Sequence, residues 1–141
     1  FRAAGDRRGE AIGLLHLGQI AHREGEATTA RARVEESLGV AVAIGQREVE
    51  GECELVLGDL AAEAGDRAAA AARFERSLAV CRQAGDRRGE ANAQHRLGRL
   101  ALDLGAHAVA RPRLGEALAA FRAFEMPVEL LDCLEDHAVL L

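Results

Sequence analysis

The chain has 141 residues, of which 49% are hydrophobic and 29% are charged, so it is suited to form a folded domain and does not have the composition of a disordered segment. Its formal net charge is −5, and all 18 of its basic residues are Arg. The acidic balance argues against general nucleic-acid binding, which needs a basic surface. The apolar runs are too short to span a bilayer, so we expect no contact with a membrane.

A repeat with a 40-residue period runs through the sequence. The pair Leu-Gly occurs at 17–18, 57–58 and 97–98, and the heptapeptide at 5–11 returns letter for letter at 85–91, two periods later. Self-similarity at a fixed period of this length is typical of proteins whose units stack and bury their apolar faces on their neighbours.

The first unit shows how each repeat forms two helices. Ala11, Leu14, Leu17 and Ala21 recur at the three- and four-residue spacing of a buried helical stripe. A second stripe follows after Gly25. It consists of Ala30, Val34, Leu38 and Ala41.

Glycine and aspartate mark the boundaries of the helices. Gly25 and Gly45 follow the two stripes of the first unit, where glycine accepts the left-handed conformation that ends a helix. Asp6 and Asp86 then lie where the next helix needs an N-cap.

The pattern predicts about seven helices. We expect the first helices of the units at 7–24, 47–64, 87–104 and 127–140, and the second helices at 28–44, 67–84 and 107–123. Pro127 suits the first turn of the last helix, whereas Pro112 is expected to delay or bend its helix. The single domain 1–141 then contains repeats at about 6–45, 46–85 and 86–125 and a terminal helix at 127–141.

The residues on these stripes resemble the tetratricopeptide repeat. The matching positions of the first unit are Leu17, Gly18, Ala21, Ala30, Val34, Ser37 and Leu38, and they recur in the second and third units. The resemblance implies an all-α, right-handed α-solenoid of stacked helix-turn-helix units. The 40-residue form with Gly-Asp-Arg at the unit boundary resembles repeats of the LGN/Pins group.

The same form is similar to the C-terminal repeats of bacterial LuxR- and SARP-type regulators that carry a STAND ATPase module. Cys133-Leu134-Glu135 resembles the closing repeat of those regulators. The exclusive use of Arg, with abundant Ala and Gly, is typical of a GC-rich bacterial genome. Phe1 aligns with Cys81 and Phe121, near the end of a second helix, so we expect the chain to be part of a longer protein.

The resemblance implies that the first helices line a concave, partner-binding face. The inward positions predicted to contact a partner are Gln19, His22, Glu52, Asp59, Asn92, His95 and Arg99. Glu52 and Asp59 would form an acidic step, and His95 and Arg99 a basic step that suits a carboxylate. The alternative is that these residues are ordinary solvated helix positions.

Two peptide-binding styles of the family are disfavoured by the residues present. The dicarboxylate clamp of chaperone adaptors needs Lys and Asn where this chain has Leu15, Leu55 and His95, and then Gln19, Asp59 and Arg99. The LGN/Pins groove relies on Asn after Leu-Gly, which is absent here. The large apolar residue Leu14 is replaced by Glu54 and Gln94 in the next two units, which predicts a slimmer interior.

Signals for catalysis, cofactors and metals are absent from the sequence. The five His and three Cys residues show no zinc-binding spacing, and no phosphate-binding loop occurs. Cys53, Cys81 and Cys133 fit small buried positions in a reducing cytoplasm, and Ser37 and Ser77 fit core hydroxyls. We therefore expect no enzyme, no cofactor and no metal site.

The sequence leaves three functional hypotheses open. The first is a protein–protein interaction module, a sensor or scaffold of a larger bacterial regulator that binds a peptide or partner helix in its concave groove. The second is a small-molecule effector domain of a STAND/LuxR-type transcriptional regulator. The third is self-association through exposed end helices, with a candidate surface at Leu130, Leu131, Leu134, Val139, Leu140 and Leu141.

Overall fold

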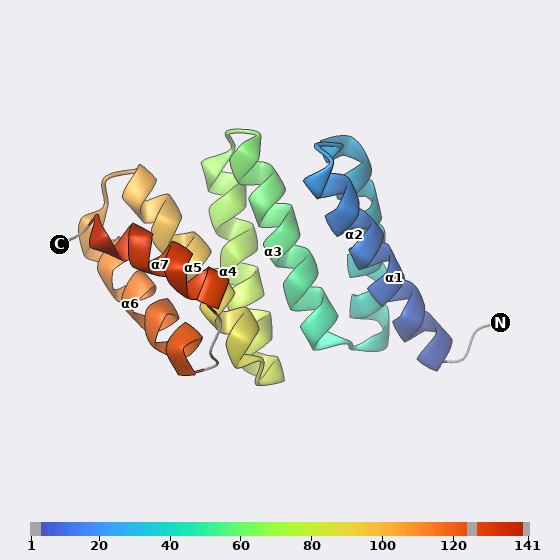
Figure 1. The fold of residues 1–141 in the computed structure, drawn as a ribbon. Coiled ribbons are helices and arrows are strands. Elements are labelled where there is room, and N and C mark those ends of the chain that lie inside the picture. Colours follow the sequence, from blue (N-terminus) through green and yellow to red (C-terminus); the bar gives the residue numbers. More distant parts are fainter. Residues whose placement is uncertain (1–3, 124–126, 140–141) are drawn as a thin grey trace.

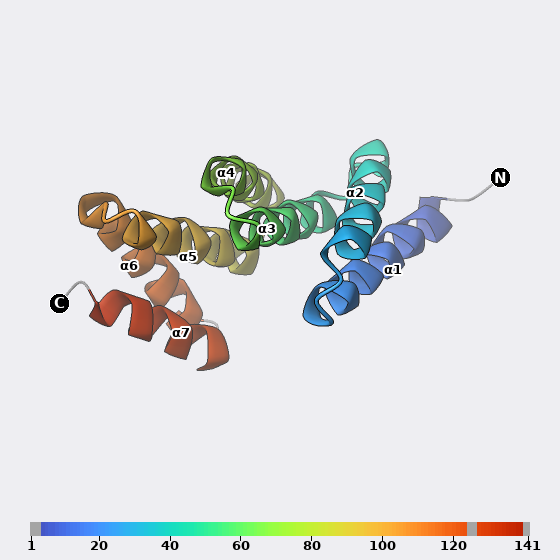
Figure 2. The ribbon, with the colours of Figure 1, turned by 90° about the horizontal axis from the view of Figure 1, so that it is seen from above.

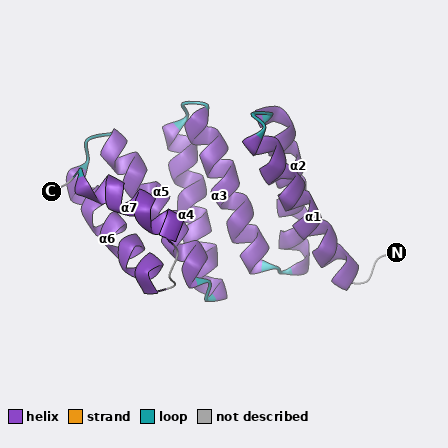
Figure 3. Cartoon of the chain, in the orientation of Figure 1, coloured by secondary structure: helices purple, strands orange, loops and turns teal. Residues whose placement is uncertain are grey.

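The computed structural model of the chain describes residues 4–123 and 127–139, and this part consists of helices and short turns (Figures 1 and 3). The helices are α1 (Ala4–Arg23), α2 (Ala27–Ile44), α3 (Arg47–Glu63), α4 (Arg67–Ala84), α5 (Arg87–Asp103), α6 (His107–Ala123) and α7 (Pro127–Ala138). Their bounds agree with the predicted ranges to within three residues.

Consecutive helices form hairpins that stand side by side. The pairs α1/α2, α3/α4 and α5/α6 make the closest contacts, and each second helix also packs against the first helix of the next hairpin. Figure 1 shows the hairpins in a row with the two ends of the chain at opposite ends, and Figure 2 shows the same row from above. The predicted all-α solenoid of stacked helical hairpins is therefore confirmed.

Left-handed glycines end the helices where the sequence predicts them. Gly25, Gly45, Gly65, Gly85 and Gly105 have positive φ angles between 71° and 85°. At two of these turns an aspartate then caps the next helix. The carboxylates of Asp66 and Asp86 accept hydrogen bonds of 3.0 Å from the backbone N–H groups of Ala69 and Gly89.

Two expectations for the first helix are wrong. Asp6 does not cap a helix, because α1 already begins at Ala4 and includes Gly5 and Asp6. Each helical residue added to an existing helix gains a backbone hydrogen bond, so the helix extends where no tertiary contact demands a turn. Leu17 is not part of the buried stripe: 53% of it is exposed, whereas its equivalents Leu57 and Leu97 are 5% and 8% exposed.

The glycine of each Leu-Gly pair lies where two helices of one hairpin approach closely. A Cβ atom on Gly58 would overlap the ring of Phe74 on α4, and one on Gly98 would overlap Leu114 on α6. Phe74 and Leu114 are fully buried, so neither has room to move aside. This close approach explains why glycine stands inside a helix, where it costs about 1 kcal/mol relative to alanine.

Buried hydroxyls join the two helices of a hairpin. Ser37 and Ser77 donate hydrogen bonds of 2.6 and 2.8 Å to the carbonyl oxygens of Ala11 and Gly51, which lie 26 residues earlier in the preceding helix. Both serines are core hydroxyls, as predicted, but their partners lie on the neighbouring helix and not on their own. All three cysteines are free and buried, which also agrees with the prediction.

The C-terminal part departs little from the expected pattern. Pro112 lies inside α6 and does not delay its start, which is at His107. In α7, Leu131 and Val139 are exposed and Leu134 is half-buried. The other members of the predicted end surface, the side chain of Leu130 and the residues Leu140 and Leu141, lie outside the described part, as does Phe1.

Replacing Gly58 by alanine tests the close contact between Gly58 and Phe74. We expect Gly58→Ala to lower the free energy of unfolding by about 1–3 kcal/mol, because the new methyl group overpacks against Phe74. Gly39 in α2 is the matched control, since a Cβ there meets no atom within 4 Å. Gly39→Ala should raise the free energy of unfolding by up to about 1 kcal/mol in urea titrations. Equal effects of the two substitutions would contradict the close approach.

Candidate partner-binding surface

The first helices α1, α3 and α5, together with α7, frame two hollows. The first hollow has a volume of about 410 Å³ and lies near the ends of α1 and α3 and along the second half of α5. It is lined by His22, Asp59, Ala62, Glu63, Phe74, His95, Arg96, Arg99, Leu100, Asp103 and Asp132. The second hollow has a volume of about 510 Å³. Its lining includes Gln19, Glu48, Glu52, Leu55, Val56, Asp86, Arg88, Asn92 and Glu129.

All seven predicted residues lie in one of these hollows. His22, Asp59, His95 and Arg99 line the first hollow, and Gln19, Glu52 and Asn92 line the second. A further cavity of about 600 Å³ among α4, α5 and α6 contains none of them. The seven predicted residues therefore lie in two neighbouring hollows on the first-helix side of the solenoid.

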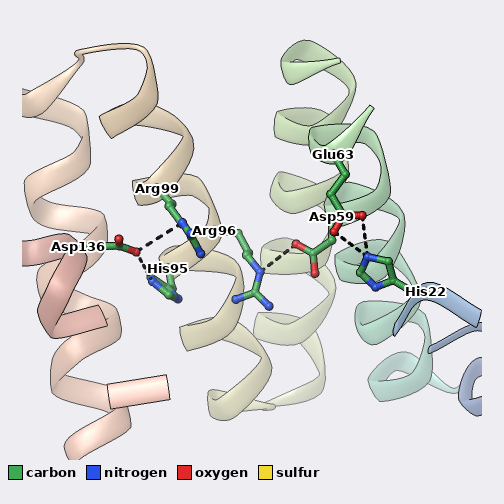
Figure 4. A network of polar contacts seen from close by, with 7 residues as sticks. All are labelled: His22, Asp59, Glu63, His95, Arg96, Arg99 and Asp136. Carbon is green, nitrogen blue, oxygen red and sulfur yellow. Dashed lines mark hydrogen bonds and ion pairs between the residues drawn. The ribbon is translucent and has the colours of Figure 1, made fainter. Parts of the chain in front are cut away.

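Polar pairs between successive first helices cross the first hollow (Figure 4). His22 on α1 lies 2.7 Å from the carboxylate of Glu63 on α3. The guanidinium of Arg96 on α5 donates a hydrogen bond of 2.9 Å to Asp59 on α3. Asp59 is thus already paired within the chain. The predicted acidic step is therefore partly neutralised by a basic residue of the next unit.

The ion pair of Asp59 has a counterpart one unit later with the charges exchanged. Arg99 on α5 lies 3.7 Å from Asp136 on α7, and these two positions are the 40-residue equivalents of Asp59 and Arg96. The backbone geometry of the repeat thus brings the same two positions together twice. In the contact between α3 and α5 the earlier residue is the acidic one, Asp59. In the contact between α5 and α7 the earlier residue is the basic one, Arg99.

His95 is buried and is not accessible to a partner. It is only 2% exposed, its Nε2 atom lies 2.8 Å from Asp136, and its ring meets the edge of Phe121 at a centroid distance of 6.0 Å. Burial lowers the pKa of His95, although the bond to Asp136 acts in the opposite direction. Arg99, with 58% of its side chain exposed, is left as the accessible base of the predicted basic step.

Acidic groups dominate the second hollow. Glu48, Glu52, Asp86 and Glu129 line it together with one basic residue, Arg88. Partial burial, followed by the nearby charge of Asp86, raises the pKa of Glu52. Leu55 and Val56 are apolar residues of the same lining. The hollow therefore combines negative charge with apolar surface.

Two buried polar residues replace the apolar position occupied by Leu14 in the first unit. Glu54 accepts a hydrogen bond of 2.9 Å from Arg73, and Gln94 accepts one of the same length from Arg113, 19 residues later in each case. Glu54 and Gln94 are 4% and 3% exposed. Each arginine thus pairs with one oxygen of the buried polar side chain, and the second carboxylate oxygen of Glu54, Oε2, is buried without a hydrogen-bond partner.

Sequence reasoning missed several acidic residues in and beside the first hollow. Glu63 and Asp103, which line the hollow, were not among the predicted contacts, and neither was Asp136, which pairs with His95 and Arg99. A signal for Glu63 and Asp136 was present in the register, because the ion pairs between neighbouring first helices join residues that are 37 or 41 positions apart, close to one repeat. A search for opposite charges at these separations would have found these two residues.

Other kinds of site find no support in the described residues. Within 4–123 and 127–139, no three His, Cys, Asp or Glu side chains are placed to hold a metal ion. In the same part of the chain, no helix is long and apolar enough to cross a membrane. Burial raises the pKa of the Cys53, Cys81 and Cys133 thiols to about 11, so all three are poor nucleophiles at neutral pH.

The comparison with protein families decides the family. The tetratricopeptide repeat model matches residues 9–83 and again residues 57–123. The chain belongs to the tetratricopeptide repeat family. Domains of this family generally mediate protein–protein interaction and are typically scaffolds without catalytic activity. No curated protein sequence matches the chain.

A solved structure supports the same fold. The C-terminal tetratricopeptide-containing domain of a putative FK506-binding protein from Plasmodium falciparum superposes with a TM-score of 0.71. The alignment covers 99% of this chain and 91% of that chain, with 15% sequence identity. At this identity the likeness establishes the fold alone.

The exchanged ion pairs can be tested by swapping charges. We expect Asp59→Arg to lower the free energy of unfolding by about 1 kcal/mol, because it places two arginines side by side. The double variant Asp59→Arg/Arg96→Asp should recover most of this loss, since Arg99 and Asp136 show that the same positions accept the opposite polarity. Urea titrations of the single and double variants make the comparison. Additive losses would show that the pair contributes nothing as a pair.

The buried histidine should make stability depend on pH. The pKa of His95 is lowered in the folded chain, so the unfolded chain takes up a proton first as the pH falls below about 6.5. The contribution of His95 to stability is complete above that pH and declines below it. Between pH 7.5 and 5.5 the wild type should lose more stability than His95→Gln. His107→Gln, at an exposed histidine, should follow the wild type. Parallel curves for all three proteins would refute the assignment.

Proposed function

We propose that the chain is a protein–protein interaction module that binds a peptide or a partner helix across its two hollows. The observation that carries this proposal is the presence of two neighbouring hollows on the first-helix side, each lined by both apolar and charged residues. A short polypeptide offers both kinds of group at a spacing of a few ångströms, because side chains recur regularly along a strand or helix.

The charges on the rims suggest how a partner is oriented. Arg99 in the first hollow is accessible and lies at a loose 3.7 Å from Asp136, so an incoming carboxylate can compete for it. Glu52 in the second hollow is exposed and lies near further carboxylates. A bound segment would therefore place an acidic group at Arg99 and a basic or polar group at Glu52.

A small-molecule effector domain is the second candidate. The first hollow, at about 410 Å³, is within the size range of ligand sites. Its lining is mostly charged, however, with Asp59, Glu63, Arg96 and Arg99 among the residues present. Such a lining suits a polar polypeptide. An apolar effector would instead need an enclosed pocket with a hydrophobic lining.

The larger context of the module is also a proposal. The likeness of its 40-residue units to the C-terminal repeats of LuxR- and SARP-type regulators supports a place in a larger bacterial regulator, as its sensor or scaffold part. The three free, buried thiols are consistent with a reducing cytoplasm. Self-association through the exposed ends would compete with either function.

Peptide selection with directed variants tests the proposed binding face. Random twelve-residue peptides displayed on phage are selected against the immobilised chain, and the best sequences are titrated by fluorescence anisotropy. We expect Arg99→Ala and Glu52→Ala each to weaken binding at least fivefold, because each removes one charged contact of about 1 kcal/mol or more at the rim.

The matched control lies on the second-helix side. Arg76 on α4 is exposed and lines neither hollow, so Arg76→Ala should leave the affinity unchanged. Peptides that bind all three variants as tightly as the wild type would place the binding surface elsewhere. A failure to select any peptide, combined with binding from a library of polar metabolites that Arg99→Ala abolishes, would favour the effector domain.

A further inference from the structure

The cavity of about 600 Å³ among α4, α5 and α6 is separate from the proposed binding face, and we refer to it as the third hollow. Its lining comes from the second helices α4 and α6 and from α5, and it shares no residue with either of the other two hollows. Its volume is within the range of small-ligand sites. The third hollow therefore has room for a ligand of its own.

Most polar side chains of the third hollow already have partners within the chain. Arg82 donates a hydrogen bond of 3.1 Å to Glu90. Gln94, which is 3% exposed, donates one of 2.6 Å to Glu116 and accepts one from Arg113. These four lining residues therefore leave no charge of the third hollow unmatched among themselves.

Arg87 is the exception in this lining. It is exposed, and its guanidinium forms no hydrogen bond or ion pair with any residue in the part of the chain that the structure describes. A guanidinium keeps its charge at all ordinary pH values and presents a planar set of donors that matches a carboxylate. The group that the third hollow leaves unmatched is therefore a cation.

The preceding junction of the repeat, among α2, α3 and α4, shows the same arginine with a partner. Arg47 is the 40-residue equivalent of Arg87, and its Nη1 atom donates a hydrogen bond of 2.8 Å to the side-chain oxygen of Gln83 on α4. The equivalent of Gln83 on α6 is Ala123, which lines the third hollow and has no side-chain acceptor. Arg87 thus lacks the oxygen that the same position receives one repeat earlier.

An aliphatic side chain is missing from the same place. Val80 on α4 is 8% exposed, and its Cγ1 atom lies 3.8 Å from the position of a Cβ atom built on Gly51 of α3. The equivalents of Val80 and Gly51 are Ala120 and Ala91, and both line the third hollow. The third hollow therefore lies where the preceding junction has an aliphatic group and an oxygen acceptor.

We propose that the third hollow binds a short aliphatic carboxylate, with its carboxylate on the guanidinium of Arg87 and its apolar carbons against Ala91 and Ala120. The ligand supplies the two groups that Gln83 and Val80 supply in the preceding junction. Side chains three residues apart on a helix have Cβ atoms about 5–6 Å apart, so a carboxylate and a branched apolar group separated by a few bonds fit these two places. The site is independent of the concave face, because the hollows share no residue.

Two sources offer this chemistry. A free branched-chain carboxylic acid carries both groups in one small molecule, and a polypeptide that ends in leucine carries them in its last residue. In both cases the carboxylate makes a charge-assisted hydrogen bond to Arg87, which is stronger than the bond that a neutral amide makes.

NMR titration with defined probes tests the site. The first probe is 4-methylpentanoate, and 4-methylpentanamide has the same shape without the charge. The second probe is an N-acetylated pentapeptide with a C-terminal leucine, used as the free acid and as the C-terminal amide. Each is added to the ¹⁵N-labelled 141-residue chain, and the backbone amide shifts of residues 87–94 and 116–123 are followed.

We expect saturable shifts around the third hollow with a carboxylate probe, and binding of its amide that is weaker by about fivefold or more. Arg87→Gln should weaken binding of the carboxylate by a similar factor, because it removes the charge. Ala123→Gln should do the same without removing the charge, since it gives Arg87 the partner that Gln83 gives Arg47. Arg88→Gln is the matched control, because Arg88 is exposed and lines the second hollow and not the third.

The outcomes separate the source of the ligand from the existence of the site. Binding of 4-methylpentanoate alone would identify a free acid, and binding of the peptide acid alone would identify a polypeptide C-terminus; both support the proposal. Equal affinity for the acids and the amides, or for the wild type and Arg87→Gln, would overturn it. So would shifts confined to the first hollow, which would place the carboxylate at Arg99, or the absence of shifts with every probe at millimolar concentrations.

Discussion

Burial of each second helix between two first helices is the constraint on which this structure depends. A helical hairpin of this sequence has apolar residues on more faces than its own two helices can cover. The clusters that join α2 to α3 and α4 to α5 therefore supply the contacts that a single hairpin lacks. The internal serine bonds and the close approach at Gly58 set the spacing within a hairpin, and stacking then sets the spacing between hairpins.

The polar contacts of the first-helix side follow from that stacking. Neighbouring first helices lie close enough for side chains 37 or 41 residues apart to meet, as at Asp59–Arg96 and Arg99–Asp136. Asp59, Arg96 and Arg99 line the first hollow, so these pairs use part of its charge within the chain. Charged groups that remain exposed, Arg99 above all, are the ones that a partner can contact. The ion pairs within the solenoid therefore limit which charges are available for recognition.

Much of the surface was visible in the sequence once the repeat was aligned. The register placed Asp59, Arg99 and Glu52 on the first helices, and the structure brings each of them to a hollow. The burial of His95 could not be predicted from the sequence, because His95 contacts Phe121 on α6 and Asp136 on α7, which are far from it along the chain. The pairing of Glu54 with Arg73 was missed for a similar reason. A charged residue at a core position can be explained only when its partner on another helix is known.

The sequence by itself determined the helices, their ends and their order, since helical periodicity, left-handed glycines and capping aspartates act within a few residues of the chain. Only the tertiary structure decided which equivalent positions are buried and which charges remain free. Leu17 and Leu57 have the same local sequence role, yet one is exposed and the other is covered by α2. The octapeptide at 4–11 and 84–91 makes the same point for the backbone. Local propensity permits either a turn or a helix there, because the same residues lie inside α1 in one copy and cap α5 in the other.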